Sequence, residues 1–240
     1  MKHLNLTFET PEENLACDEA LLDLCESGKL HDEILRFWEP KEHFVVVGYA
    51  NQAAKEVNLN TCEKNHIPIF RRSSGGGTVL QGPGCLNYAL ILKINGTKSL
   101  KSITETNRYV LERHQKALES SLGEKIEIQG LSDLTIKTLK FSGNAQRRKK
   151  NFLLFHGTFL LAMDIKLIDK FLPLPSKHPE YRGNRPHSKF LTNLESSSEN
   201  IQAALRKEWK ANEEFNEVPS EPIQSLARDR FLSEKWNLKF

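Results

Sequence analysis

The stretch RRSSGGGTVLQGPGCLNYALIL, residues 71–92, joins two arginines, two serines and three consecutive glycines to a largely apolar run. Each glycine destabilises a regular element by about 0.5 to 1 kcal/mol relative to alanine, and one glycine is enough for an ordinary turn. Backbone N–H groups without a neighbouring Cβ can, however, approach a phosphate or carboxylate closely. The pattern therefore indicates an anion-binding loop. A glycine-rich hairpin between strands at 67–70 and 86–92 is the alternative.

The composition is that of an ordinary globular protein. The chain has 240 residues, of which 38% are hydrophobic and 27% charged, which is enough for one sizeable core. No apolar run approaches the roughly 18 to 20 residues of a membrane span, and the first residues lack the apolar region of a signal peptide. We therefore expect no membrane association and a cytoplasmic location.

Charge and cysteine spacing exclude several classes of site. The net charge of +3 is too small to indicate a nucleic-acid partner, and we interpret the cluster Arg147-Arg148-Lys149-Lys150 as a solvated β-turn. The four cysteines form no C-x-x-C pair, and the eight histidines form no H-x-x-x-H pattern. We expect neither a disulfide scaffold nor a structural metal.

Helix and strand signals follow each other irregularly along the chain. Thr10, Pro11 and Glu13 predict a helix that runs to about Ser27, and the capping box of Ser102 and Glu105 predicts one that ends at Gly123. A short helix is expected within 53–66, and further helices at 199–214 and 222–232. Strands are predicted at 33–38, 44–48, 125–128, 133–136, 140–142 and 152–163. This order favours an α+β fold with mixed, mostly antiparallel sheets over a doubly wound parallel sheet.

Two further segments carry possible chemistry. Lys140 precedes Ser-Gly-Asn-Ala-Gln and could place a compact positive charge against a carbonyl or phosphate oxygen, although a lone lysine is usually a surface residue. The triplet His156-Gly157-Thr158 interrupts an apolar strand, where the glycine suggests close approach of another group and the histidine could equally be a core residue. The chain has neither G-x-x-x-x-G-K-[ST] nor G-x-G-x-x-G, which argues against a classical NTPase or dehydrogenase.

These segments together resemble the signature blocks of the lipoate-protein ligase family, within the biotin and lipoate ligase fold. The blocks are residues 71–92, 140–161 and 179–194, with ENLACDEALL at 13–22 and the stretch at 35–52, so the similarity covers nearly the whole chain. The resemblance implies one catalytic domain over residues 1–240, with a helical closing segment from about 197 to 240 and no accessory domain.

The resemblance also implies a reaction. Enzymes of this family activate lipoate or octanoate with ATP and magnesium to an acyl-adenylate. They then transfer the acyl group to a lysine on an acceptor domain of a 2-oxoacid dehydrogenase or a glycine-cleavage protein. A separate accessory chain is a possible partner. No enzyme nucleophile is required, because the mixed anhydride is already electrophilic, and the protein supplies positioning and charge stabilisation.

Matching residues to the family's motifs implies roles for individual side chains. Lys140 would be catalytic and neutralise charge on carbonyl and phosphate oxygens, Val79 would line the acyl tunnel, and Asn144 would lie near the magnesium and phosphates. The residues expected to hold the acyl-adenylate are Arg72, Ser74, Gly75, Gly76, Gly77, Val79, Asn144, His156, Gly157 and Thr158.

The chain departs from the family at Gln81-Gly82-Pro83-Gly84-Cys85, where many ligases read H-D-x-G-N. Cys85 raises a second possibility, an ATP-independent octanoyl or lipoyl transferase that passes the acyl group through a thioester. Related octanoyltransferases place their cysteine shortly before the lysine motif, where this chain has Gly130-Leu131-Ser132-Asp133, and we interpret Cys85 as structural. The residues are also compatible with a transferase that uses preformed lipoyl-AMP and with a non-catalytic lipoyl-binding module.

Overall fold

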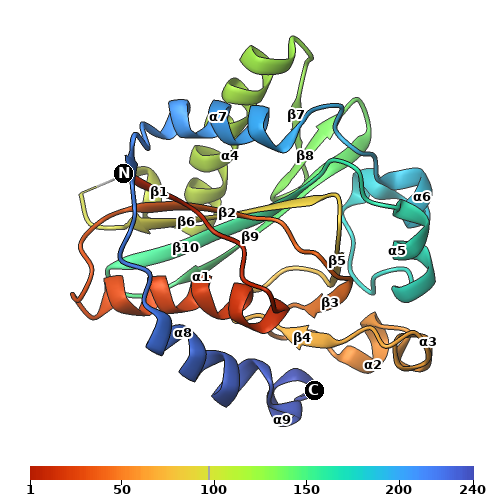
Figure 1. Cartoon of the computed structure of the whole chain (residues 1–240). Coiled ribbons are helices and arrows are strands. Elements are labelled where there is room, and N and C mark those ends of the chain that lie inside the picture. The colour runs from red at the N-terminus through yellow and green to blue at the C-terminus, as the bar shows by residue number, and fades with distance from the viewer. Residues whose placement is uncertain (97) are drawn as a thin grey trace.

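The computed structural model describes residues 1–96 and 98–240, and within them the strands form two sheets (Figure 1). The larger has eight strands in the order β11-β1-β2-β6-β10-β9-β8-β7, and the smaller has the order β4-β3-β5. The strands of the larger sheet are β1 (Lys2–Asn5), β2 (Ile34–Trp38), β6 (Cys85–Lys93), β7 (Glu127–Gln129), β8 (Asp133–Ile136), β9 (Leu139–Arg148), β10 (Phe152–Leu160) and β11 (Glu213–Glu214). Those of the smaller sheet are β3 (Phe44–Val47), β4 (Ile69–Arg71) and β5 (Val79–Gln81).

Most strand pairs are antiparallel. The strands from β2 through β6, β10, β9 and β8 to β7 pair antiparallel, whereas β1 pairs parallel with both β2 and β11. In the small sheet β3 pairs parallel with β4 and antiparallel with β5. The predicted α+β class with mixed, mostly antiparallel sheets is confirmed.

Helices cover both faces of the large sheet (Figure 1). On one face lie α4 (Ile103–Leu122) and α7 (Ser198–Trp209), and on the other α1 (Pro11–Glu26) and α8 (Ser220–Leu226), which continues into a π-helix (Ala227–Phe231) and α9 (Glu234–Asn237). Around the small sheet lie α2 (Ala53–Glu56), α3 (Leu59–Lys64), α5 (Ile165–Phe171) and α6 (His187–Phe190), and short 3-10 turns span Lys98–Leu100 and Glu180–Arg182. Within the described residues, no helix has both the length and the apolar character that crossing a membrane requires.

Local signals determine where the two longest helices begin and end. The Thr10 hydroxyl accepts the Glu13 N–H at the start of α1, where proline occupies the first turn, and the Ser102 hydroxyl accepts the Glu105 N–H at the start of α4. Gly123 ends α4 with a φ of 68°, a left-handed conformation that suits glycine. The predicted boundaries of both helices are confirmed to within a residue or two.

The apolar core has three parts, one on each face of the large sheet and one at the small sheet. The first packs β6 and β10 against α4 and α7, and includes Tyr88 and Phe159. The second packs α1 and the C-terminal helices against the opposite face. The third joins β3 and β5 to α5, and contains Cys85. The second and third clusters each contain residues of both sheets, such as Phe44 with Leu154 and Leu80 with Leu160, so the small sheet is packed onto the large one.

Some predicted elements were wrong in extent. The helix predicted at 199–214 ends at Trp209, because Lys210 turns the chain with a φ of 52° and residues 213–214 pair with β1 as β11, which interrupts the expected helical closing segment. The strand predicted at 140–142 runs from Leu139 to Arg148, so only the second half of the basic cluster lies in a turn. The sequence signals did not predict the short strands β1, β5 and β11.

Candidate functional site

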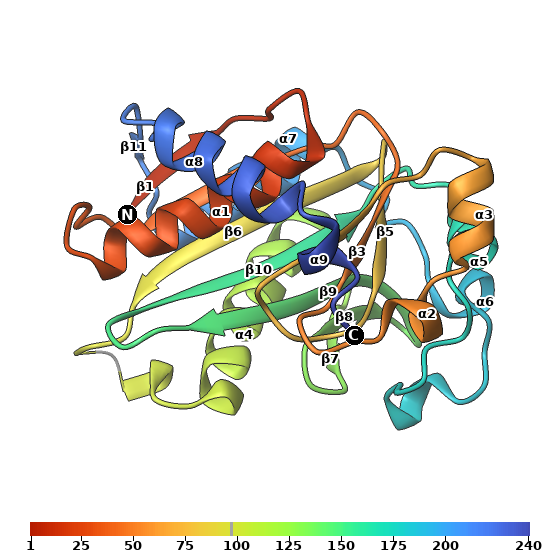
Figure 2. The same cartoon turned by 90° about the horizontal axis from the view of Figure 1, so that it is seen from below.

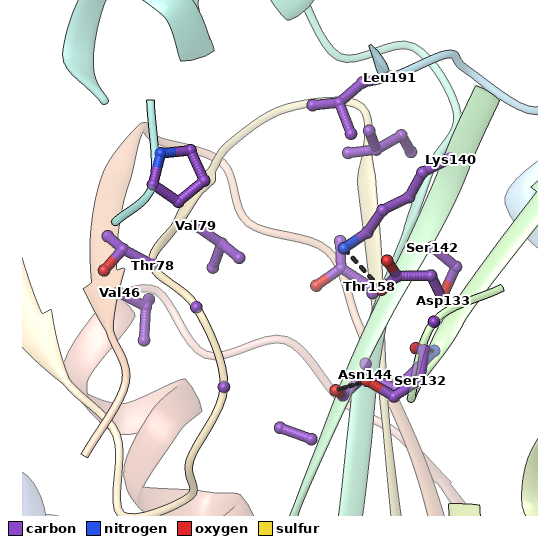
Figure 3. A pocket seen from close by; sticks show the side chains of 18 of the residues that line it. Val46, Thr78, Val79, Ser132, Asp133, Lys140, Ser142, Asn144, Thr158 and Leu191 are labelled. Carbon is purple, nitrogen blue, oxygen red and sulfur yellow. Dashed lines mark hydrogen bonds and ion pairs between the residues drawn. The ribbon is translucent and has the colours of Figure 1, made fainter. Parts of the chain in front are cut away.

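A cavity of about 850 Å³ lies between the small sheet and the β8–β10 part of the large sheet (Figure 3). Val46, Thr78 and Val79 lie on one side, and Asp133, Lys140 and Ser142 on the other. The lining includes these predicted site residues: Arg72, Gly76, Gly77, Val79, Lys140, Asn144, His156, Gly157 and Thr158. The structure thus brings most of the predicted residues to one cavity, and Gly75 and Ser74 adjoin it in the loop.

The glycine segment is a loop between β4 and β5 rather than the turn of a simple hairpin. The strands of the hairpin alternative correspond to β4 and β6, which belong to different sheets, and β4 and β5, which flank the loop, each pair with β3 and not with each other. The hairpin alternative is therefore wrong. The loop carbonyls are fully engaged: Arg72 Nη2 donates to the oxygens of Gly75 and Gly77, both at 2.7 Å. The Tyr49 N–H donates to the Ser74 oxygen at 2.9 Å, and Asn51 Nδ2 donates to the Gly76 oxygen at 3.1 Å.

The amides of the same loop have no such partners. Among the described residues, no backbone or side-chain acceptor receives the N–H of any residue from Ser74 to Thr78. Gly76, Gly77 and Thr78 line the cavity. Fixed carbonyls and unused donors are the pattern of a backbone anion-binding concavity.

Only one of the three glycines is required by the protein's own conformation. Gly76 has a φ of 88°, and a Cβ there would lie 3.0 Å from Arg72 Nη2. A Cβ at Gly75 or Gly77 would meet nothing within 4 Å. Gly48, on the neighbouring turn, is also required, because its Cβ would lie 2.1 Å from the Gly76 oxygen. The fold itself therefore does not require glycine at positions 75 and 77. The lack of a Cβ at these two positions would let a ligand approach the backbone.

Arg72 shapes this loop from within. Besides the two carbonyls, its Nε donates to Ser74 Oγ at 3.1 Å, and burial lowers the pKa of its guanidinium to about 10. The sequence prediction gave Arg72 direct contact with a carboxylate or phosphate. In the structure Nε and Nη2 donate to loop oxygens and Nη1 donates to the Val46 oxygen at 3.3 Å, and the side chain still lines the cavity.

Lys140 faces the loop across the cavity and is held by an acidic partner. Its Nζ lies 2.7 Å from Asp133 Oδ1 (Figure 3). The Tyr181 hydroxyl donates to Asp133 Oδ2 at 2.8 Å. The lysine also passes close over Gly143, where a Cβ would be 2.8 Å from Nζ. Asp133 and Tyr181 were not predicted as site residues: Asp133 is on the strand next to Lys140 but has no sequence signal for an ion pair, and Tyr181 is 48 residues from Asp133 in the chain.

The backbone around Lys140 departs from a regular strand. The pairing of β8 with β9 shifts register, so that Leu134 faces Ser142 while Thr135 faces Lys140. Such a bulge bends the strand and re-aims the side chains beside it. The Thr192 N–H donates to the Lys140 oxygen at 2.9 Å, which fixes the lysine from the other side.

Asn144 is fixed at both ends of its amide. The Tyr88 hydroxyl donates to Oδ1 at 2.6 Å, and Nδ2 donates to the Ser132 oxygen at 2.8 Å. Gly157 lies opposite Asn144 in the β9–β10 ladder, and a Cβ there would be 1.8 Å from Oδ1. This contact explains the glycine that interrupts the apolar strand.

His156 and Ser74 connect β10 to the glycine loop. Their Nε2 and Oγ atoms are 2.6 Å apart. Burial, with a smaller contribution from the charge of Arg72, lowers the pKa of His156 to about 3. The imidazole is therefore neutral near pH 7. Because Ser74 Oγ already accepts from Arg72, its hydroxyl is free to donate to His156 Nε2.

Thr158 belongs to a polar triad that the sequence predicted only in part. Its hydroxyl donates to Asn87 Oδ1 at 2.5 Å and accepts from Gln81 Nε2 at 2.7 Å, while Asn87 Nδ2 donates to Gln81 Oε1 at 3.1 Å. Gln81 stood out in the sequence only as a departure from the family pattern. All three residues line the cavity.

Apolar side chains line the rest of the cavity. The lining includes Leu15, Trp38 and Val46. It also includes Asp18, whose carboxylate is ion-paired with the fully buried Arg36 at 2.6 Å. Leu160, Ile168, Leu172 and Leu191 come from β10, α5 and the segments that follow α5 and α6. Only Val79 was predicted to line an acyl tunnel. The others read as ordinary core residues, because their periodicity is that of packed helices and strands.

The proline-rich segment 173–186 borders the cavity. Its residues Pro175, Lys177, His178, Pro179, Glu180, Tyr181 and Arg182 contribute to the lining. Ser176 donates to Glu56 on α2, and Tyr181 donates to Asp133. The segment is therefore tied to both sides of the site.

The cysteines offer no exposed thiol. All four, Cys17, Cys25, Cys62 and Cys85, are buried and unpaired. Burial raises the pKa of the Cys85 thiol to about 12, and it raises the pKa of the other three as well. A reactive cysteine needs the opposite environment, accessible and electropositive. The interpretation of Cys85 as structural agrees with its place in the third core cluster.

The protein side chains do not form a metal cage. Within residues 1–96 and 98–240, no group of three or more His, Cys, Asp or Glu side chains is placed to bind a metal ion. Both oxygens of Asp133, the carboxylate nearest Lys140, already have protein partners. These residues do not fit a resident metal.

Comparisons with known proteins show the family of the chain. A family model described as the lipoyl protein ligase A/B catalytic domain matches residues 10–211. The chain is 27% identical over 237 residues to a probable lipoate-protein ligase A from Mycoplasma pneumoniae, covering 95% of this chain and 68% of the relative. It is 29% identical over 266 residues to octanoyltransferase LipM from Brevibacillus brevis, covering 96% and 95%.

Solved structures show the same fold. A bipartite lipoate protein ligase from Thermoplasma acidophilum, studied with its E2 lipoyl domain, aligns with a TM-score of 0.83 and 25% identity over 99% of this chain and 95% of that one. A lipoate-protein ligase A bound with ATP aligns with a TM-score of 0.80 and 25% identity, covering 99% and 98%.

Proposed function

The chain belongs to the lipoyl protein ligase A/B catalytic domain family, and on that premise we propose that it is an ATP-dependent lipoate-protein ligase. It would activate lipoate or octanoate to an acyl-adenylate and transfer the acyl group to a lysine of an acceptor domain. One observation carries the proposal: unpartnered loop amides face Lys140 across a cavity that continues between apolar side chains. An acyl-adenylate is a mixed anhydride with an anionic phosphate and an apolar acyl chain. It needs hydrogen-bond donors and positive charge around the phosphate, and apolar side chains around the acyl chain.

In the first step a carboxylate oxygen attacks the α-phosphorus of ATP, the C–O–P bond forms and pyrophosphate leaves. The loop amides from Gly76 to Thr78 would donate to the anionic oxygens, and Lys140 would approach them from the opposite wall. Because Asp133 already compensates the charge of Lys140, the substrate anion shares the lysine with Asp133 instead of meeting a free charge. The ligase structure bound with ATP supports a nucleotide for this fold.

In the second step the acceptor amine attacks the acyl carbonyl, AMP leaves, and the amine loses a proton to solvent. Lys140 would stabilise the oxyanion, as an oxyanion-hole donor does. His156 is neutral and hydrogen-bonded to Ser74, so it adds no charge and holds the loop against β10. We assign the remaining predicted residues, Gly75, Val79, Asn144, Gly157 and Thr158, to the walls of this site.

Magnesium enters this proposal only with the nucleotide. Mg²⁺ commonly binds through substrate phosphates, one or two carboxylates and water. The lack of a protein cage among the described residues is therefore compatible with a MgATP substrate.

The acceptor would be a lipoyl domain. The bipartite ligase from Thermoplasma acidophilum was studied with an E2 lipoyl domain, which supports this class of partner. We propose that segment 173–186 closes the cavity around the adenylate, because a mixed anhydride must be shielded from water.

An octanoyltransferase is the second candidate. It is favoured by the similarity to LipM, which extends over 95% of that relative. The burial of Cys17, Cys25, Cys62 and Cys85 argues against a thioester route through any of them. A transferase using preformed acyl-AMP would need no thiol and keeps the same assignment of walls.

The deciding experiment is the intact mass of a purified lipoyl acceptor domain after incubation with this protein, lipoate, ATP and magnesium. Addition of a lipoyl group, together with lipoate-dependent exchange of pyrophosphate into ATP, is the expected result. Transfer from octanoyl-acyl-carrier protein without ATP, with no exchange, would replace the ligase by the transferase. Binding of acyl-adenylate without any modification of the acceptor would leave only a binding module.

A further inference from the structure

Arg71, next to Arg72, lies outside the cavity and has a different set of partners. Its side chain is fully buried. Nη1 donates to three carbonyl oxygens of one turn, those of Gly48 at 2.9 Å, Tyr49 at 3.0 Å and Asn51 at 2.8 Å. One guanidinium group therefore fixes the turn between β3 and α2.

The same turn holds the glycine loop. The Tyr49 N–H donates to the Ser74 oxygen, and Asn51 Nδ2 donates to the Gly76 oxygen. Gly48 lies so close to the Gly76 oxygen that a Cβ would overlap it. Two of the loop carbonyls thus depend on the turn that Arg71 organises.

The helix α9 binds Arg71 from the other side. Arg71 Nε donates to the Trp236 oxygen at 3.1 Å, the Trp236 indole Nε1 donates to the Arg71 oxygen at 2.8 Å, and the Arg71 N–H donates to Asn237 Oδ1 at 3.0 Å. The rings of Tyr49 and Trp236 are 5.9 Å apart. Figure 2 shows α8 and α9 leading along α1 toward the small sheet.

We propose that α9, acting through Arg71 and the turn at 48–51, positions the glycine loop, which makes Arg71 and Trp236 positioning residues. A continuous set of hydrogen bonds runs from Trp236 through Arg71 and Tyr49 to Ser74. None of these groups lines the cavity, so they act on a ligand only through the loop. The effect on the reaction rests on the proposed function, whereas the effect on the loop does not.

The test uses the full chain and two conservative variants. Trp236→Phe keeps an aromatic ring and removes the indole donor, and Arg71→Lys keeps the charge but cannot reach three carbonyls and Trp236 together. Leu232→Ala, at a largely exposed leucine outside α9, is the matched control. The readouts are amide hydrogen exchange at Tyr49 by NMR, the affinity of a non-hydrolysable acyl-sulfamoyl-adenosine by calorimetry, and the thermal midpoint.

We expect exchange at Tyr49 to accelerate about tenfold in Trp236→Phe and more in Arg71→Lys, with affinity for the analogue falling by a similar factor. The control should match the wild type in both. If Tyr49 exchanges at the wild-type rate in Trp236→Phe and Arg71→Lys, the inference is overturned, whatever happens to the thermal midpoint. If the wild-type protein does not bind the analogue, the proposed function fails, and exchange at Tyr49 alone still decides the positioning role.

Discussion

The two walls of the cavity are built on opposite principles. In the glycine loop the protein engages the carbonyl oxygens, and the amides find no acceptor within residues 1–96 and 98–240. Across from it, Lys140 is already paired with Asp133, and Asn144 is bonded at both ends. One wall offers donors to an anion, while on the other wall an anion would share Lys140 with Asp133. The loop should therefore dominate ground-state binding, and the lysine should act when charge develops.

The largest effect is expected at Lys140, where a loss of rate can be distinguished from a loss of binding. Replacing Lys140 with alanine should lower lipoate-dependent pyrophosphate exchange by about 100- to 1000-fold, because one charge-stabilising donor is removed. Affinity for an acyl-sulfamoyl-adenosine should fall less. Lys116→Ala, at an exposed position of α4, is the control. Equal losses in binding and rate would contradict the division between the two walls.

The glycines test the other wall. Gly76→Ala should cost about 2 kcal/mol of unfolding free energy, because alanine is strained at a φ of 88° and its Cβ crowds Arg72. Gly75→Ala is a matched control in the same loop and should change stability by no more than about 0.5 kcal/mol. Urea denaturation measures both. Similar losses in the two variants would mean that the loop is not held as described.

A pH titration tests the packing of His114 against Tyr88, whose hydroxyl donates to Asn144 on the lysine wall. His114 is fully buried, packs edge-on against Tyr88 with ring centroids 4.8 Å apart, and has no hydrogen-bond partner at either nitrogen among the described residues. Burial, and to a lesser degree the charge of Arg113, lowers its pKa to about 3.

The unfolded chain therefore takes up a proton near pH 6.5, while the folded chain stays neutral there. The contribution of His114 is fully present above pH 6.5 and is lost as the pH falls toward 3, by about 1.4 kcal/mol per pH unit. His114→Phe should reduce the slope of unfolding free energy between pH 6 and 4 by that amount. An unchanged slope would place the pH dependence elsewhere.

The smallest effect is expected at the edge of the lysine wall. Tyr181→Phe removes one hydroxyl donor to Asp133 and should lower the free energy of unfolding by about 1 kcal/mol or less. The remaining Asp133 to Lys140 pair should hold, so activity should fall only a few-fold. Lipoyl transfer to the acceptor domain, measured with and without saturating ATP, tests this. A loss as large as that of Lys140→Ala would show that segment 173–186 does more than border the site.

Sequence signals predicted those parts of the fold that depend on near neighbours. The caps at Thr10 and Ser102 and the left-handed Gly123 each involve a few adjacent residues, and the two helices followed. The strands β1 and β11 pair across about 210 positions and have only two to four residues each, so no local pattern distinguishes them from loops.

The same division applies to the site. The glycine run and Lys140 stand out in sequence because their residue types are unusual in a strand or turn. Their roles toward a substrate stay a prediction. Of the partners that fix them, Asn51 lies 25 residues from Gly76 and Tyr181 lies 48 residues from Asp133, whereas Asp133 itself is on the strand next to Lys140, and none carries a signal of its own. Residue chemistry can indicate what a wall binds, whereas only the tertiary structure tells which of its atoms are already in use.

The contacts of Arg71 with Trp236 and Asn237 have a consequence for the order in which the protein matures. The chain is synthesised from its N-terminus, and the groups that seat Arg71 emerge about 165 residues after it. While the nascent chain is still being made, both sheets can begin to form, but the glycine loop lacks its last support. Competence of the glycine loop to bind an anion would then arise only after α9 has been synthesised and has packed against Arg71.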